Sequence, residues 1–210
     1  GADRIFLLGG AHSIFAFTYG TESVPRSDLI CGPGNKYVTE AKRQVFGKVG
    51  IDGLYGPTET LVIADKSNDA ELCASDLITQ AEHDIEATPI LITNSLDFSK
   101  KVEKEIYKQA ELLPRKDIIL KSFKLNGLLF VVENMNQSIE LANLISSEHV
   151  SILSEEIINQ YKKIVNAGGI FLGDDSGEVF GDYIVGTNHV LPTSGSAKFS
   201  SGLGVLDFMK

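Results

Sequence analysis

Cysteines, basic residues and long apolar runs are all scarce in this chain. Its two cysteines, Cys31 and Cys73, are too few and too isolated for a disulfide framework, which favours a reducing compartment, and we expect a cytoplasmic protein. Lys and Arg number 19 against 28 Asp and Glu, a net charge of -9. This balance argues against a nucleic-acid backbone or an anionic membrane as the main partner, since both select for basic residues. No apolar run is close in length to a membrane helix, which needs about 18 to 20 apolar residues.

Short apolar runs alternate with amphipathic stretches along the whole chain. The expected strands are residues 5–8, 29–31, 60–64, 90–93, 128–132, 150–153 and 170–172. The expected helices are residues 11–19, 36–46, 70–82, 98–113, 138–145 and 155–166. Asn35 is the expected N-cap of the second helix, and Asn68 or Asp69 that of the third. Solid apolar strands between helices are typical of a parallel sheet covered on both faces, so the predicted fold class is α/β, an αβα sandwich.

A loop rich in Gly and Pro, residues 53–59, is the best candidate boundary between two lobes. We expect residues 1–55 to form a first lobe with too few strand-helix units for an independent core. Residues 56–195 then form the main α/β lobe, and residues 196–210 begin a C-terminal extension.

Gln80 and His83 are three residues apart at the end of an expected helix, so both side chains can reach one metal ion. An amide oxygen among the ligands suggests a site tuned for exchange with substrate rather than a closed structural zinc site. The alternative is a solvated or hydrogen-bonded histidine beside a surface glutamine.

Glu148-His149 precedes an apolar run, and Asp182 and His189 are each embedded among glycines. Adjacent residues on an extended segment point to opposite sides, so Glu148 and His149 can share a role only if the backbone turns there. The functional interpretation is a general acid/base pair, because histidine titrates near neutral pH. The alternative is a solvated loop with a capping glutamate. The glycines favour a loop that brings backbone close to a ligand.

Gly9-Gly10 and Gly32-Pro33-Gly34-Asn35 are expected at strand-to-helix turns. Free backbone N–H groups and the helix dipole favour anions such as a pyrophosphate at such turns, although tight turns also need glycine for steric reasons alone. In open parallel sheets these turns lie at the carboxyl ends of the strands, where we expect the active site.

Together these strings resemble the histidinol dehydrogenase family from one end of the chain to the other. The matching strings are Gly9-Gly10-Ala11, Gly20-Thr21-Glu22-Ser23-Val24-Pro25, Gly32-Pro33-Gly34-Asn35, Val38-Thr39-Glu40-Ala41-Lys42-Arg43, Gly56-Pro57-Thr58-Glu59, Gln80-Ala81-Glu82-His83, Glu148-His149, Gly173-Asp174, Gly181-Asp182-Tyr183 and Gly186-Thr187-Asn188-His189-Val190-Leu191-Pro192-Thr193. The resemblance implies incomplete Rossmann-like lobes of the histidinol and aldehyde dehydrogenase-like type, with residues 1–55 a remnant of the cofactor-binding lobe.

Roles for individual residues follow from the resemblance. It implies that Gln80, His83 and Asp182 are zinc ligands that also bind the substrate. It also implies that Glu148 and His149 are the catalytic acid/base pair, and that His149 binds the substrate as well.

Further contacts are implied for substrate and cofactor. Thr58 stands where the family has a substrate-contacting hydroxyl, usually serine, and His189 matches a histidine near the substrate. Asn35 matches an NAD contact, and His12 occupies the position of a glutamine that commonly contacts NAD.

The implied activity is the zinc-dependent oxidation of L-histidinol to L-histidine through a bound aldehyde, with two successive NAD molecules. Family members are longer at both ends, and their C-terminal segment supplies a substrate-binding Glu and a zinc-binding His to the partner in a homodimer. We therefore expect this chain alone to bind zinc weakly and to turn over negligibly. The alternatives are a non-catalytic binding or assembly module of the same fold, and a zinc hydrolase with Glu148 as base.

Overall fold

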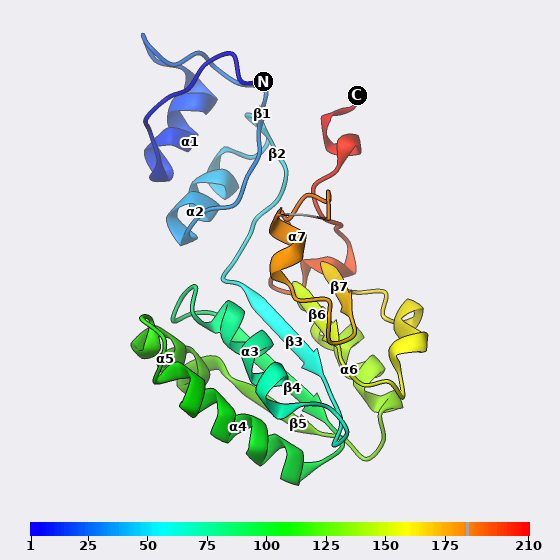
Figure 1. Cartoon of the computed structure of the whole chain (residues 1–210). Coiled ribbons are helices and arrows are strands. Elements are labelled where there is room, and N and C mark those ends of the chain that lie inside the picture. Colours follow the sequence, from blue (N-terminus) through cyan, green and yellow to red (C-terminus); the bar gives the residue numbers. More distant parts are fainter. Residues whose placement is uncertain (184) are drawn as a thin grey trace. The chain divides into compact units, whose positions relative to one another are not determined.

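The computed structural model describes residues 1–183 and 185–210 (Figure 1). These residues divide into a first unit, residues 1–56 with 203–210, and a second unit, residues 57–202. The division after Gly56 lies inside the predicted loop, whereas residues 203–210 group with the first unit. None of the helices in the described residues is both long and apolar enough to span a membrane.

The first unit is built from helices α1 (Gly10–Tyr19) and α2 (Lys36–Val45), with the short parallel strands β1 (Leu29–Ile30) and β2 (Gly50–Ile51) and the 3-10 helix η3 (Val205–Phe208). Its core gathers apolar side chains from α1, β1 and α2 and from the segment before β2: Ile14, Ile30, Ala41, Val45 and Val49.

The strand predicted at residues 5–8 does not form. A strand needs a partner for its N–H and C=O groups, and this segment pairs with no other strand in the described chain. Its side chains Ile5 and Leu7 are exposed.

The second unit is an α/β sandwich around a parallel sheet in the order β5-β4-β3-β6-β7. The strands are β3 (Glu59–Ile63), β4 (Thr88–Thr93), β5 (Leu128–Val131), β6 (His149–Ile152) and β7 (Gly169–Leu172). The other elements are α3 (Ala70–Ala81), α4 (Leu96–Ala110), α5 (Lys116–Asn126), α6 (Asn136–Ile145), η1 (Ile158–Lys163), α7 (Val179–Tyr183) and η2 (Ser196–Lys198). The predicted fold class is confirmed.

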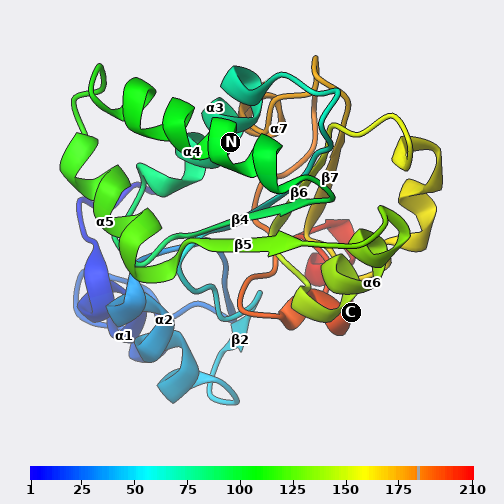
Figure 2. The same cartoon turned by 90° about the horizontal axis from the view of Figure 1, so that it is seen from below.

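Helices cover both faces of this sheet (Figure 2). Val62 and Leu91 face a core shared with α3, α4 and α5, whereas Leu61 and Ile90 face a core shared with α6 and η1. Neighbouring residues of one strand are therefore buried on opposite faces, which explains the unbroken apolar runs Leu61–Ile63 of β3 and Ile90–Ile92 of β4.

The structure corrects two helix predictions and adds two α-helices. The predicted helix 155–166 is reduced to turns and η1, which is closed by short-range bonds such as Gln160 N–H to Ile157 O at 2.7 Å. The predicted helix 98–113 is α4, which ends before Pro114. After that proline the chain starts the unpredicted helix α5, and α7 is likewise unpredicted.

Ile92 tests the placement of the sheet core. Its side chain is fully buried, at 0% exposure, and we expect Ile92→Ala to lower the unfolding free energy by about 2 to 5 kcal/mol because it leaves a cavity. Leu144→Ala is the control, since Leu144 is 69% exposed and should change stability by less than about 0.5 kcal/mol. Urea unfolding followed by circular dichroism measures both, and equal effects would contradict the buried position of β4.

Candidate active site

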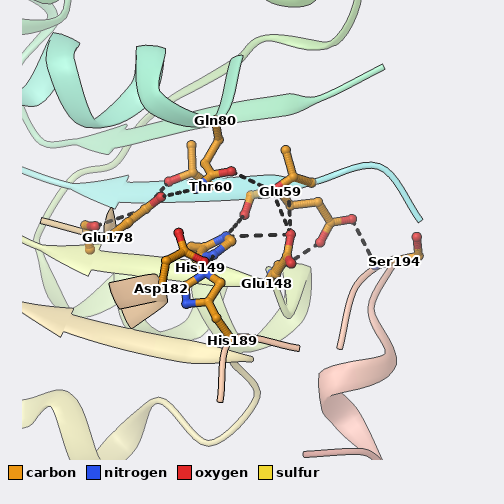
Figure 3. Close-up of polar contacts among 11 residues, drawn as sticks. Glu59, Thr60, Gln80, Glu148, His149, Glu178, Asp182, His189 and Ser194 are labelled. Atoms are coloured by element: carbon orange, nitrogen blue, oxygen red, sulfur yellow. Dashed lines mark hydrogen bonds and ion pairs between the residues drawn. The ribbon is translucent and has the colours of Figure 1, made fainter. Parts of the chain in front are cut away.

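The candidate site lies at the amino edge of the sheet, where β3 and β6 begin side by side (Figure 3). Thr60 of β3 is opposite His149 of β6. Thr58 comes just before β3, and Glu148 just before β6. Residues that precede parallel strands lie at the amino ends, so the expectation of a site at the carboxyl ends is wrong for this cluster.

Polar groups at the carboxyl ends of the same strands form hydrogen bonds that connect those ends. Asp65 accepts hydrogen bonds from the hydroxyl of Ser154 and, at 2.8 Å, from the backbone N–H of Ser67. Asn68 Nδ2 donates to the carbonyl of Leu153 at 2.9 Å. These bonds fix the spacing of β3 and β6 from the edge opposite the site.

Two glutamates connect the starts of β3 and β6 by reciprocal hydrogen bonds. The backbone N–H of Glu59 donates to Glu148 Oε2 at 3.2 Å, and the backbone N–H of Glu148 donates to Glu59 Oε2 at 3.3 Å. Glu59 Oε1 also accepts from the backbone N–H of Ser194 at 3.1 Å. Each carboxyl thus satisfies a strand-start N–H that the sheet itself leaves unpaired.

The backbone bends at Glu148, and this bend turns its side chain toward His149. Glu148 Oε2 lies 3.6 Å from His149 Nδ1, so the adjacent residues share one site. Burial raises the pKa of Glu148 to about 7, against the opposing effect of hydrogen bonds from the Thr58 hydroxyl and the Glu59 N–H. A carboxyl with this pKa can hold or release a proton near neutral pH.

The ring of His149 is held in one tautomer. Its Nδ1 lies 3.0 Å from the carbonyl oxygen of Glu59, which can only accept, so Nδ1 carries the proton. Its Nε2 lies 2.7 Å from His189 Nε2, which must then be the donor. The side chain is 2% exposed, and burial lowers the pKa of His149 to about 4. His149 is therefore a neutral base with its lone pair on Nε2.

A glycine gives His189 room to reach His149. A Cβ atom added at Gly181, in α7, would lie 2.6 Å from His189 Nδ1. Asp182 follows on the same helix, and its carboxylate lies 3.8 Å from His189 Nε2. The glycine next to Asp182 thus permits a close approach within the site.

Gln80 joins the site through both ends of its amide. Thr58 Oγ1 lies 2.8 Å from Gln80 Oε1 and 2.7 Å from Glu148 Oε2, and its single proton serves one of these acceptors at a time. Gln80 Nε2 donates to Glu178 Oε2 at 3.0 Å. Glu178 is 2% exposed, and burial raises its pKa to about 7.

The predicted metal ligands all belong to the second unit. Gln80 lies in the last turn of α3, and His83 follows in a turn closed by its N–H to Gln80 O at 3.1 Å. The side chains of His83 and Asp182 are exposed, whereas that of Gln80 is buried. Within residues 1–183 and 185–210 no group of three His, Cys, Asp or Glu is arranged to hold a metal. The predicted set contains only two such residues beside its glutamine, so its role as a zinc site stays a prediction.

The predicted cofactor residues lie in the first unit. Asn35 is the N-cap of α2, as predicted, and its Oδ1 accepts from the N–H groups of Tyr37 at 3.1 Å and Val38 at 3.2 Å. His12 lies in the first turn of α1 with an exposed side chain. The cofactor roles of both residues stay predictions.

Sequence reasoning missed Glu59 and Glu178 as parts of this site. Glu59 belongs to the string that ends in Thr58-Glu59, so its place beside Thr58 could have been noticed. Glu178 precedes Asp182 by about one helical turn and has no local signal, because only the folded chain brings it to Gln80.

The fold recurs in proteins of distant sequence. A propionaldehyde dehydrogenase from Clostridium phytofermentans superposes with a TM-score of 0.53 at 15% identity, over 94% of this chain and 57% of that one. At this identity the likeness concerns the fold alone. It places the chain in the Rossmann-like α/β class that also contains aldehyde dehydrogenases.

The match to one family covers the whole chain. The model of the histidinol dehydrogenase family matches residues 1–210. Histidinol dehydrogenase from Dehalococcoides mccartyi is 48% identical over 100% of this chain and 48% of that protein. The crystal structure of histidinol dehydrogenase from Elizabethkingia anophelis superposes with a TM-score of 0.93 at 39% identity, over 99% of this chain and 48% of that one.

The chain belongs to the histidinol dehydrogenase family, a family of oxidoreductases. It spans about half the length of the curated relatives it matches.

Asp76, in α3, is one of the charges that raise the pKa of Glu178, so it tests the acidic surroundings of the site. Burial raises its pKa from the ordinary 3.8 to about 6, and Asp174 adds to this effect. The folded state therefore binds this proton more tightly than the unfolded chain, so stability falls as pH rises from about 4 to about 6.

We expect Asp76→Asn to raise the unfolding free energy at pH 8 by about 1 kcal/mol, because solvent screens part of the effect. The gain should shrink as pH falls and vanish below about pH 4. Urea unfolding at several pH values measures it, and a gain that is the same at pH 4 and pH 8 would contradict the shifted pKa.

Proposed function

We propose that this chain carries the acid/base residues of an NAD- and zinc-dependent histidinol dehydrogenase, which oxidises L-histidinol to L-histidine through bound histidinal. The observation that carries the proposal is the pair of half-buried Glu148 and buried His149, with 3.6 Å between Oε2 and Nδ1 and pKa values shifted in opposite directions. Family membership supports the substrate and the place in histidine biosynthesis. The proposal includes a cytoplasmic homodimer with shared active sites, as expected for the family.

The donor set at the amino edge fits a zinc ion chemically. Gln80 directs its amide oxygen away from Glu178, and the His83 imidazole and the Asp182 carboxylate are exposed. Oxygen and imidazole nitrogen are ligands that zinc accepts. When bound, zinc supplies a Lewis acid and an anchor for the substrate nitrogens.

His149 is the base of the alcohol oxidation in this proposal. Its Nε2 lone pair is occupied by the N–H of His189 at 2.7 Å. A substrate hydroxyl that replaces this N–H as the donor loses its proton to Nε2. The Glu59 carbonyl on Nδ1 then stabilises the positive ring.

Glu148 serves the aldehyde step. As a carboxylate it accepts a proton from the water whose oxygen adds to the aldehyde carbon, and it returns this proton to the former carbonyl oxygen to give the hydrate that is oxidised next. Its pKa of about 7 leaves both protonation states populated near neutral pH.

Asn35 and His12 are proposed to contact NAD, which supplies the hydride acceptor when bound. The Asn35 oxygen is already used by two backbone N–H groups of α2, which leaves its amide nitrogen for a cofactor contact. The Gly-Pro-Gly turn before Asn35 supports an anionic ligand at this helix start.

His149→Ala in the full-length protein tests the base. We expect histidinol-dependent NADH formation to fall by about 10² to 10⁴-fold, because no other group takes the hydroxyl proton. Absorbance of NADH measures the rate, and a melting curve checks that the variant is folded. An unchanged rate would contradict the assignment, and wild-type protein that forms no NADH from histidinol would favour a hydrolase with Glu148 as base.

Glu148→Gln should separate the two oxidations. The amide cannot take a proton from water, so we expect oxidation of added L-histidinal to slow by about 10² to 10⁴-fold. Rapid mixing with histidinol should still give a fast first equivalent of NADH. Two equivalents at the wild-type rate would exclude Glu148 from aldehyde hydration.

A further inference from the structure

Glu178 lies at the centre of a buried hydrogen-bond network beside the site (Figure 3). Its Oε1 accepts from the hydroxyl of Thr60 at 2.5 Å and from that of Ser151 at 3.2 Å. Its Oε2 accepts from Gln80 Nε2 at 3.0 Å. Strands β3 and β6 thus hold the carboxyl from one side, and α3 presents Gln80 to the other oxygen.

These contacts determine which way the amide of Gln80 is turned. Glu178 Oε1 already accepts from two hydroxyls, and in the ionised carboxyl Oε2 also only accepts, so Gln80 presents its NH₂ group to Glu178. The amide oxygen then points to the opposite side, where Thr58 Oγ1 lies at 2.8 Å. With Glu178 ionised, a flipped amide would place two acceptor oxygens against each other in a buried environment, which is strongly unfavourable.

We propose that Glu178 is a positioning residue that fixes the Gln80 amide with its oxygen directed toward the metal. The inference rests on the proposed function, in which Gln80 is a zinc ligand. In this inference Glu178 acts on the metal through Gln80, to which its Oε2 is hydrogen-bonded. Residues that orient a metal ligand in this way typically change metal affinity by about 10- to 100-fold when removed.

Three substitutions separate orientation from charge and packing. Glu178→Met keeps the length of the side chain but removes the acceptor, so the amide of Gln80 can flip. Glu178→Gln removes the charge but keeps an acceptor oxygen for Gln80 Nε2, while its own NH₂ group can donate to the hydroxyls of Thr60 and Ser151. Glu178→Asp keeps the charge but draws the carboxylate back from Gln80.

The experiment measures zinc affinity by competition with a chromogenic chelator, on metal-free full-length protein whose folding is checked by melting curves. We expect Glu178→Met and Glu178→Asp to weaken zinc binding by about 10- to 100-fold, and Glu178→Gln to stay within about threefold of wild type. Ser151→Ala is the matched control, since it removes one bond to Glu178 and leaves the bond to Gln80, and it should also stay within about threefold.

The outcomes separate this inference from the proposed function. Equal losses in Glu178→Gln and Glu178→Asp, or wild-type affinity in Glu178→Asp, overturn the positioning role. The Asp and Gln variants decide the question even if Glu178→Met does not fold. Gln80→Ala is measured beside them: if it binds zinc like wild type, or if wild type binds no zinc, the ligand assignment of the proposed function fails instead.

Discussion

β3 and β6 pair in parallel with Thr60 opposite His149, and the rest of the site depends on this register. It places the carbonyl of Glu59 where His149 Nδ1 donates to it, and the reciprocal bonds of Glu59 and Glu148 fasten the same two strand starts. A slip by one residue would turn every side chain of β6 to the other face of the sheet. The residues of the site therefore stand on strands that apolar cores stabilise on both faces of the sheet.

Burial at this edge shifts the pKa values of the acid and the base in opposite directions. Low solvent exposure disfavours the charged form of any group, which raises the pKa of Glu148 and lowers that of His149. The pKa of Glu148 therefore lies close to neutral pH, and His149 is uncharged at that pH. The hydrogen bonds to Thr58 and the Glu59 carbonyl limit these shifts while they fix the orientation of both side chains. A carboxyl and an imidazole that are neighbours in sequence can thus take different roles in two successive oxidations.

The sequence was sufficient for features that depend on local chemistry. The apolar runs of β3 and β4 and the capping side chain of Asn35 are examples, because period, burial and a side-chain acceptor determine them. Features set by distant parts of the chain were not predictable in this way. Residues 5–8 are apolar but have no partner strand in the described chain. Glu178 contacts Gln80 only in the folded chain, so the sequence alone does not mark it as part of the site. The bend that turns Glu148 toward His149 is also a property of the folded backbone.

The tautomer of His149 is the most direct test of this account, because the register of β3 and β6, the burial of the ring and its role as a base all meet there. Nitrogen-15 NMR of histidine-labelled full-length protein, with His149→Ala to assign the signals, reports which ring nitrogen carries the proton. The account predicts a neutral ring at pH 7 with the proton on Nδ1 and a lone pair on Nε2. A ring protonated on Nε2 alone, or on both nitrogens at pH 7, would contradict it.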